Sequence, residues 1–139
     1  MDSSPLQPAV RVFLVDDAIS IRKRIAARFG QIEGVEIVGE AEEPGAALDA
    51  IGATAADVVV MDLHLSGGSG IDLLRNLAQS MSTVITNHSG TWFRQACVAN
   101  GAQYFFDKTS EFDLACNTIE RIAHQHCARG LYHLGAHHV

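Results

Sequence analysis

Five short apolar runs recur along the chain, and a segment with helical spacing follows each of them. We expect strands at residues 10–15, 35–39, 57–63, 83–86 and 103–106. We expect the helices at residues 19–29, 44–51, 71–77 and 92–99, and from about residue 110 onward. Strict alternation of strands and helices implies a parallel sheet with right-handed crossovers and helices on both faces. The sequence therefore predicts a doubly wound α/β fold of the (βα)5 type.

The size and composition of the chain indicate one folded domain. Its 139 residues are 47% hydrophobic and 19% charged, which supports one well-filled core. We expect this domain at residues 10–126, after a disordered or extended stretch at 1–9. Residues 127–139 have no clear period, so we expect a frayed end or a docking tail there. The three cysteines lack CxxC spacing, which favours reduced packing residues over a disulfide or zinc site.

Charge and hydropathy argue against several kinds of partner. The net charge of −6 and the pI near 5.5 disfavour direct nucleic-acid binding, which needs a concentrated basic face. The apolar runs at 10–15 and 58–61 are too short to cross a bilayer, and the first ten residues lack the basic and apolar regions of a signal peptide. We therefore expect a cytoplasmic protein that binds neither DNA nor a membrane.

Polar residues lie at the predicted carboxyl ends of the strands. Functional groups gather at this edge in open parallel sheets. Acids end the first and third strands, a threonine closes the fourth and a lysine follows the fifth: Asp16, Asp17, Asp62, Thr86 and Lys108. The third run is apolar on both faces, which is typical of a central strand. The topology therefore predicts that these five side chains meet at one edge of the sheet.

Three crowded carboxylates repel one another unless a cation lies among them. Oxygen ligands suit Mg²⁺, which typically takes one or two carboxylates together with a phosphate. A carboxylate can also act as a nucleophile and form an acyl phosphate, while a metal and a lysine neutralise charge on the transferring group. Asp62 is best placed to be this nucleophile. Lys108 would then supply a positive charge, and Thr86 a hydroxyl that donates to a phosphoryl oxygen.

Taken in order along the chain, these residues resemble the site of a response-regulator receiver domain of two-component signalling. The matching motifs are FLVDD with Asp16 and Asp17, VVVMDLHLSGGSGIDLL with Asp62, VITNHSG with Thr86, and GAQYFFDKTSEF with Lys108. The similarity runs from about residue 10 to about residue 123. It implies a flavodoxin-like fold with strand order 2-1-3-4-5. It also implies that a sensor histidine kinase transfers a phosphoryl group to Asp62.

The resemblance further implies roles for single residues. Asp17 and Asp62 would bind Mg²⁺ directly, Asp16 would bind it through water, and the backbone carbonyl of His64 would complete the protein ligands. Phe105 occupies the position of a switch aromatic that rotates as the threonine hydroxyl moves toward the phosphoryl group. The surface of the fourth helix, fifth strand and fifth helix would then bind an unknown output protein, and a homodimer is left open.

Two positions depart from the family's pattern. Ser66 stands where the family has a proline four residues after the phosphoacceptor, and Thr109 replaces the proline after the strand-five lysine. A cis bond before a non-proline residue costs roughly 3 kcal/mol, so we expect a trans bond or a rearranged loop before Thr109. The segment before the fourth strand is also a few residues short. If this register is wrong, Ser89 or His88 takes the switch role assigned to Thr86.

Three functions compete on these residues. The first is a stand-alone phosphoacceptor module that is not itself an enzyme. The second is a degenerate receiver that acts as a phosphorylation-independent interaction module. The absence of the two prolines favours this alternative. The third is an aspartate-nucleophile phosphatase of the haloacid-dehalogenase type. That class requires DxD after the first strand, where this chain has DDA, and 139 residues leave no cap domain.

Overall fold

The structure is a computed structural model that describes residues 9–62, 64–65, 68–77, 82–87, 95, 98–107 and 110–136, with the backbone alone at 64–65, 68–69, 82, 85–87 and 127–136. The first half of the chain forms β1 (Val10–Val15), α1 (Ile19–Gly30), β2 (Val35–Ala41), α2 (Pro44–Thr54) and β3 (Val58–Asp62). The second half forms β4 (His64–Leu65), β5 (Gly68–Ser69), α3 (Gly70–Asn76), β6 (Ser82–Asn87), β7 (Tyr104–Asp107) and α5 (Phe112–Ala136).

Five of the strands form one parallel sheet. Their order is β2-β1-β3-β6-β7, and all four pairings are parallel. Counted along the chain, this is the order 2-1-3-4-5, so the predicted flavodoxin-like topology is confirmed. β3 lies in the middle and is buried at each of its five residues. A strand covered on both faces has no polar side, which is why its sequence is apolar without alternation.

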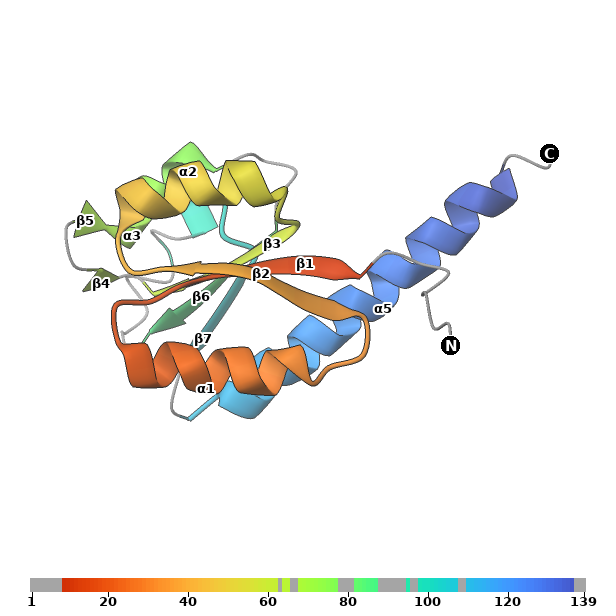
Figure 1. Ribbon diagram of the computed structural model, residues 1–139, viewed down its shortest axis with the longest axis horizontal. Helices are drawn as coiled ribbons and strands as arrows, with labels where there is room; N and C mark the ends of the chain where they lie inside the picture. The colour runs from red at the N-terminus through yellow and green to blue at the C-terminus, as the bar shows by residue number, and fades with distance from the viewer. Residues whose placement is uncertain are drawn as a thin grey trace.

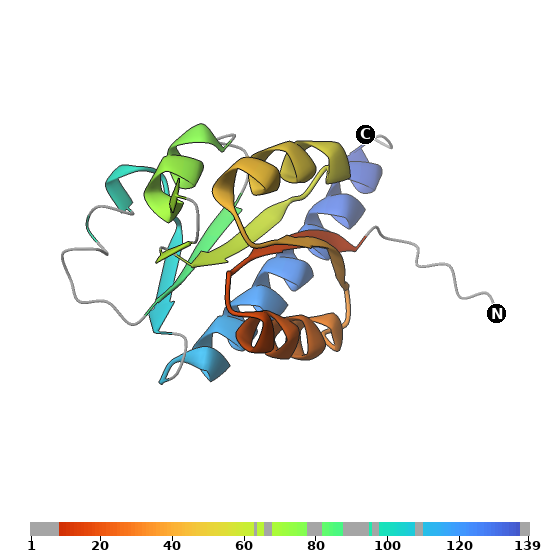
Figure 2. The same cartoon turned by 60° about the vertical axis from the view of Figure 1, so that its left-hand side comes forward.

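Helices cover both faces of this sheet. Figures 1 and 2 show α2 and α3 side by side on one face, and α1 and α5 on the other. The layer under α2 and α3 contains Phe13, Val15, Ala47, Ile51, Val59, Met61, Leu73 and Leu74. The layer under α1 and α5 contains Val12, Leu14, Ile25, Phe29, Val58, Val60, Ile119 and Ile122. Successive strand residues therefore alternate between two cores, as the pleat of a strand requires.

The last helix differs from the expectation. A frayed end or a docking tail was expected from residue 127, whereas the helical backbone of α5 continues without a break through 25 residues to Ala136. Figure 1 shows its far end projecting beyond the sheet. Within the described part of the chain, no helix is long and apolar enough to cross a membrane. Of the helix expected at 92–99, Gln95, Val98 and Ala99 are helical and the other residues lie outside the description.

The glycine-rich segment after β3 forms a small hairpin. His64–Leu65 pairs antiparallel with Gly68–Ser69 through two residue pairs, His64 with Ser69 and Leu65 with Gly68. Ser66, where the family has a proline, lies outside the described residues. α3 begins directly after the hairpin, at Gly70. This arrangement leads the chain from the end of β3 to the face of the sheet that α2 also covers.

One cysteine side chain is described. Cys116 on α5 is a free thiol, packed at the edge of the core under α1 and α5. Burial raises its pKa above the ordinary value, which keeps the thiol protonated near neutral pH. This fits the predicted packing role. Cys97 and the side chain of Cys127 lie outside the described residues.

Candidate functional site

Three acidic side chains converge at the carboxyl edge of the sheet. Asp16 and Asp17 follow β1, and Asp62 is the last residue of β3. One carboxylate oxygen from each residue can be chosen so that all three lie within 4.8 Å of one another. Asp16 and Asp62 are almost fully buried, at 2% and 4% exposure, whereas Asp17 is exposed. The structure therefore brings together the three carboxylates that the sequence placed at this edge.

The register of the sheet explains this convergence. Val15 of β1 pairs with Met61 of β3, so the acids that follow each of them lie at the same level. Val60 and Leu14 face the core under α1 and α5, and residues two further along a strand point to the same side. Asp62 and Asp16 occupy those positions. The side chains leave the apolar layer just where the strands end, which places their carboxylates together at its rim.

Asp16 is held on its backbone and its side chain. Its N–H donates to the carbonyl of Ala41 at the end of β2, at 3.1 Å. Its Oδ1 accepts a hydrogen bond of 2.8 Å from the N–H of Ala18, which turns the chain into α1. Its carbonyl accepts a hydrogen bond from the guanidinium of Arg22, one turn into that helix. The acid pair therefore stands on a firmly anchored turn.

The donor set fits a divalent cation. Three carboxylates whose oxygens lie within 4.8 Å of one another repel, and the repulsion is relieved when a cation lies among them. All three donors are hard oxygen atoms, and one of the residues, Asp17, is exposed to solvent and to an incoming ligand. Mg²⁺ prefers oxygen ligands, keeps several waters and shares its coordination between carboxylates and phosphate oxygens. An acidic site with one open side matches that preference better than a closed cage does.

Of the other predicted site residues, Thr86 and His64 are described by their backbone alone. Thr86 of β6 is the register partner of Asp62, which puts the two backbones side by side at the same edge, although the threonine side chain is not described. His88 and Ser89, the alternative switch residues, lie beyond the end of β6 and outside the description. His64 begins β4, and its side chain is likewise not described.

Lys108 and Thr109 lie outside the described residues, but the chain on both sides of them is held together. The N–H of Asp107 donates to the Glu111 carboxylate at 2.9 Å, and the N–H of Ser110 donates to Oδ1 of Asp107 at 3.0 Å. These bonds close the turn between β7 and α5. The turn starts at the same edge of the sheet as the acids, because Asp107 pairs with Asn87 just beyond Thr86.

Phe105 lies on β7, one strand further from the acids than Thr86 on β6. It is partly buried, pairs with Ile85 and packs against the core layer under α2 and α3. A pocket of about 200 Å³ adjoins it, lined by Val98, Ala102, Gln103, Tyr104 and Phe105. The pocket opens on the edge strand β7, so it is separate from the acidic cluster. Val98 is 61% exposed, which leaves an apolar side chain open to solvent at this edge.

Sequence reasoning missed Arg22. The helical pattern of α1 placed it on the polar face with Lys23 and Arg24, yet its side chain is only 12% exposed. It reaches the end of β2, which no spacing within α1 can reveal. The one available signal was its place five residues after the acid pair, within reach of the turn that precedes the helix.

Comparison with known proteins agrees with the fold. A family model described as the response regulator receiver domain matches residues 12–120. The DNA-binding transcriptional activator DevR/DosR of Mycobacterium tuberculosis is 38% identical over 72 residues, which cover 52% of this chain and 33% of that protein. Protein-glutamate methylesterase/protein-glutamine glutaminase 5 of Anaeromyxobacter dehalogenans is 35% identical over 68 residues, which cover 49% of this chain and 19% of that protein.

Both curated relatives are much longer than the matched region, so the chain spans a third of their length or less. A solved structure, the two-component response regulator of the LuxR family from Aurantimonas sp. SI85-9A1, superposes with a TM-score of 0.77 and 27% identity. That match covers 92% of this chain and 99% of the other. By sequence and by fold, the chain belongs to the response regulator receiver domains, the signalling domains of two-component systems.

Proposed function

We propose that this protein accepts a phosphoryl group on Asp62 from the phosphohistidine of a sensor histidine kinase. The observation that carries the proposal is the meeting of Asp16, Asp17 and Asp62 within 4.8 Å, with Thr86 beside Asp62 in the sheet. No other described group of acids, histidines or cysteines has this arrangement. Asp62 is almost fully buried at the end of the central strand, whereas Asp17 beside it is exposed, so a partner would approach the cluster from the side of Asp17.

In the proposed reaction a carboxylate oxygen of Asp62 attacks the phosphorus atom. The P–N bond to the kinase histidine breaks, and the nitrogen leaves with the electron pair and takes up a proton. Asp17, Asp62 and the carbonyl of His64 would hold Mg²⁺ directly and Asp16 would hold it through water, and the ion would supply positive charge to the phosphoryl group. Lys108 adds a second positive charge, and the hydroxyl of Thr86 donates to a phosphoryl oxygen. Transfer then rests on positioning and charge neutralisation.

The signal would reach a partner through a change at β7, the strand that contains Phe105. Phe105 adjoins the pocket that also includes Val98 and Tyr104, so the ring has space beside it for a second position. A two-state element of this kind can be biased by a local change of charge. The surface of the helix that contains Val98, together with β7 and α5, then binds an output protein or a second copy of the chain. With a net charge of −6, the chain itself makes no direct contact with nucleic acid.

We further propose that residues 10–126 act as the phosphoacceptor unit and signal through a separate partner protein. The whole curated relatives, a methylesterase and a DNA-binding activator, are several times the length of the matched region. Their catalytic or DNA-binding activity is therefore not assigned to this chain. Binding a separate partner, or passing the phosphoryl group onward, is the corresponding output.

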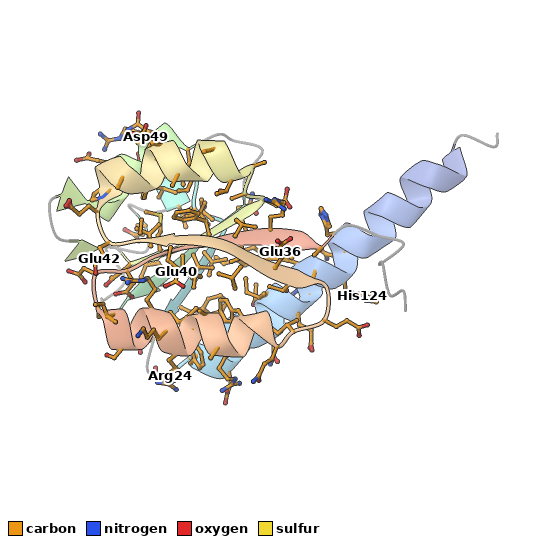
Figure 3. All side chains as sticks on the ribbon, in the orientation of Figure 1. Arg24, Glu36, Glu40, Glu42, Asp49 and His124 are labelled. Carbon is orange, nitrogen blue, oxygen red and sulfur yellow. The ribbon has the colours of Figure 1, made fainter. Side chains whose placement is uncertain are left out.

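The test is phosphorylation from a small donor. Incubated with acetyl phosphate and Mg²⁺, the protein gains the mass of one phosphoryl group, and Asp62→Asn does not. Asp49→Asn is the matched control, because it makes the same change at an exposed position on α2 (Figure 3). No gain in the parent protein would instead favour the interaction module. Rapid multiple turnover of unrelated phosphate esters would favour the phosphatase.

A further inference from the structure

Arg22 links three groups at one end of the sheet. Its Nε lies 2.8 Å from Oε1 of Glu40, and its Nη1 lies 3.7 Å from Oε1 of Glu42. The same Nη1 donates a hydrogen bond to the carbonyl oxygen of Asp16. Only 12% of the side chain is exposed, compared with 38% and 51% for the two glutamates. Figure 3 shows Glu40 and Glu42 along the end of β2 that lies nearest the start of α1.

These contacts close a ring through the site. Arg22 on α1 bonds both Glu40 and the carbonyl of Asp16, and the N–H of Asp16 bonds the carbonyl of Ala41, the next residue after Glu40. The ring therefore joins the end of β1, the first turn of α1 and the end of β2. The planar guanidinium holds its donors in a fixed fork, so one side chain can set the distance between two elements.

We propose that Arg22 is a positioning residue that holds the Asp16–Asp17 peptide in the geometry needed to bind a divalent cation. This inference rests on the proposed function of the acidic site. The carbonyl that Arg22 bonds belongs to the peptide group between the two acids, so it acts on the backbone of both. Loss of Arg22 removes one of the bonds that hold this turn, beside the bonds to Ala41 and Ala18. The two carboxylates then sample more positions relative to Asp62, and less of the population is ready to bind.

Charge and positioning make opposite predictions for this residue. A guanidinium near an acidic cluster repels a cation, so loss of its charge alone would tighten Mg²⁺ binding. Loss of a positioning contact weakens binding, because the ligands must first be ordered. The sign of the change therefore identifies the role.

The experiment compares Arg22→Gln and Arg22→Lys with Arg11→Gln. Arg11 is a matched control: it also bridges elements, through the carbonyl of Thr54 and the carboxylate of Glu36, but at the other end of β2 (Figure 3). The first readout needs no metal and is the amide hydrogen exchange of Asp16 and Ala18, measured by NMR. The second is the Mg²⁺ dissociation constant, measured by calorimetry.

We expect Arg22→Gln to speed exchange at both amides and to raise the dissociation constant about three- to tenfold, the range that corresponds to the net contribution of one typical hydrogen bond. Arg22→Lys keeps the charge without the fork and should bind Mg²⁺ more weakly than the parent. Arg11→Gln should change neither readout at the site. Tighter Mg²⁺ binding in Arg22→Gln, or unchanged exchange at Asp16 and Ala18, overturns the inference.

The parent protein separates the two proposals. If the parent binds Mg²⁺ and is phosphorylated on Asp62 while both Arg22 variants match it, the inference fails and the proposed function stands. If the parent binds no Mg²⁺, the proposed function and the cation role of Arg22 fail together. If Arg22→Gln does not fold, Glu40→Gln replaces it, because that change weakens the ring and leaves Arg22 in place. The expected signs are the same and the changes smaller.

Discussion

Single residues of this protein are constrained by neighbours on other strands, and Gly39 is the clearest case. It lies in β2 opposite Phe13 of β1, where the register of the two strands shifts between Val12 and Phe13. A Cβ atom at Gly39 would lie 2.5 Å from Cε2 of the Phe13 ring. The ring is itself buried in the core, so it has no free space into which to move. The glycine therefore makes room for the aromatic side chain.

We predict that Gly39→Ala lowers the free energy of unfolding by about 1–3 kcal/mol, the usual cost of forcing extra volume into a packed core. Urea denaturation monitored by circular dichroism measures this change. Gly52→Ala is the control, because a Cβ there meets nothing within 4 Å. It should add about 0.5–1 kcal/mol, since alanine favours helix more than glycine does. Equal stability of Gly39→Ala and the parent would show that the strands can shift apart.

Among the elements, α5 is longer than the part of it that packs on the sheet. Its first half packs on the sheet through Phe112, Ala115, Ile119, Ile122 and Ala123. Among its described side chains, none beyond Ala123 is buried, although the helical backbone continues to Ala136. The apolar period fades where the helix passes the sheet, which explains why the sequence suggested a tail. Backbone hydrogen bonds continue a helix without a core-facing stripe, so the period predicts burial and not helix length.

We predict that deletion of residues 127–139 changes the free energy of unfolding by less than about 1 kcal/mol, because the buried side chains described on α5 end at Ala123 and segments with few buried contacts contribute little to global stability. Ile119→Ala provides the scale. It removes a fully buried side chain and should cost about 2–5 kcal/mol. Thermal and urea unfolding of both variants test the proposed boundary at residue 126. A loss from the deletion as large as that from Ile119→Ala would place the distal helix within the folded domain.

At the scale of the whole molecule, the acidic cluster exists only when the sheet is assembled. Asp16 and Asp62 come from different strands and are brought together by the parallel pairing of β1 with β3. A cation that binds this cluster binds the folded chain and not the unfolded one. Its binding free energy is therefore added to the stability of the fold.

We predict that Mg²⁺ raises the unfolding temperature, by an amount equivalent to about 2.7 kcal/mol when its concentration is a hundred times the dissociation constant. Differential scanning calorimetry measures the shift. Asp62→Asn should lose most of it. Sodium chloride at the same ionic strength is the control, because salt also screens repulsion among carboxylates. An equal rise with sodium chloride would mean screening rather than a metal site.

Much of the site could be predicted because it depends on topology. The carboxyl ends of parallel strands share one edge, so acids at the ends of the first and third strands had to approach each other. Asp16, Asp17 and Asp62 do so. The roles of Thr86, Lys108, Phe105 and the His64 carbonyl remain predictions. Arg22 could not be found in this way, because its partners Glu40 and Asp16 lie on other elements.

The sequence by itself determined the alternation of five strands with helices and the central place of β3. It also determined the edge at which the acids lie, because these features depend on the period and polarity of each segment alone. Only the tertiary structure decided that Phe13 leaves no room at Gly39, that Arg22 ties β1 to β2, and that α5 runs on past the sheet. A hydrophobic period shows only which face of its own helix or strand a residue lies on. Contacts between elements depend on distances that are set only when the layers pack.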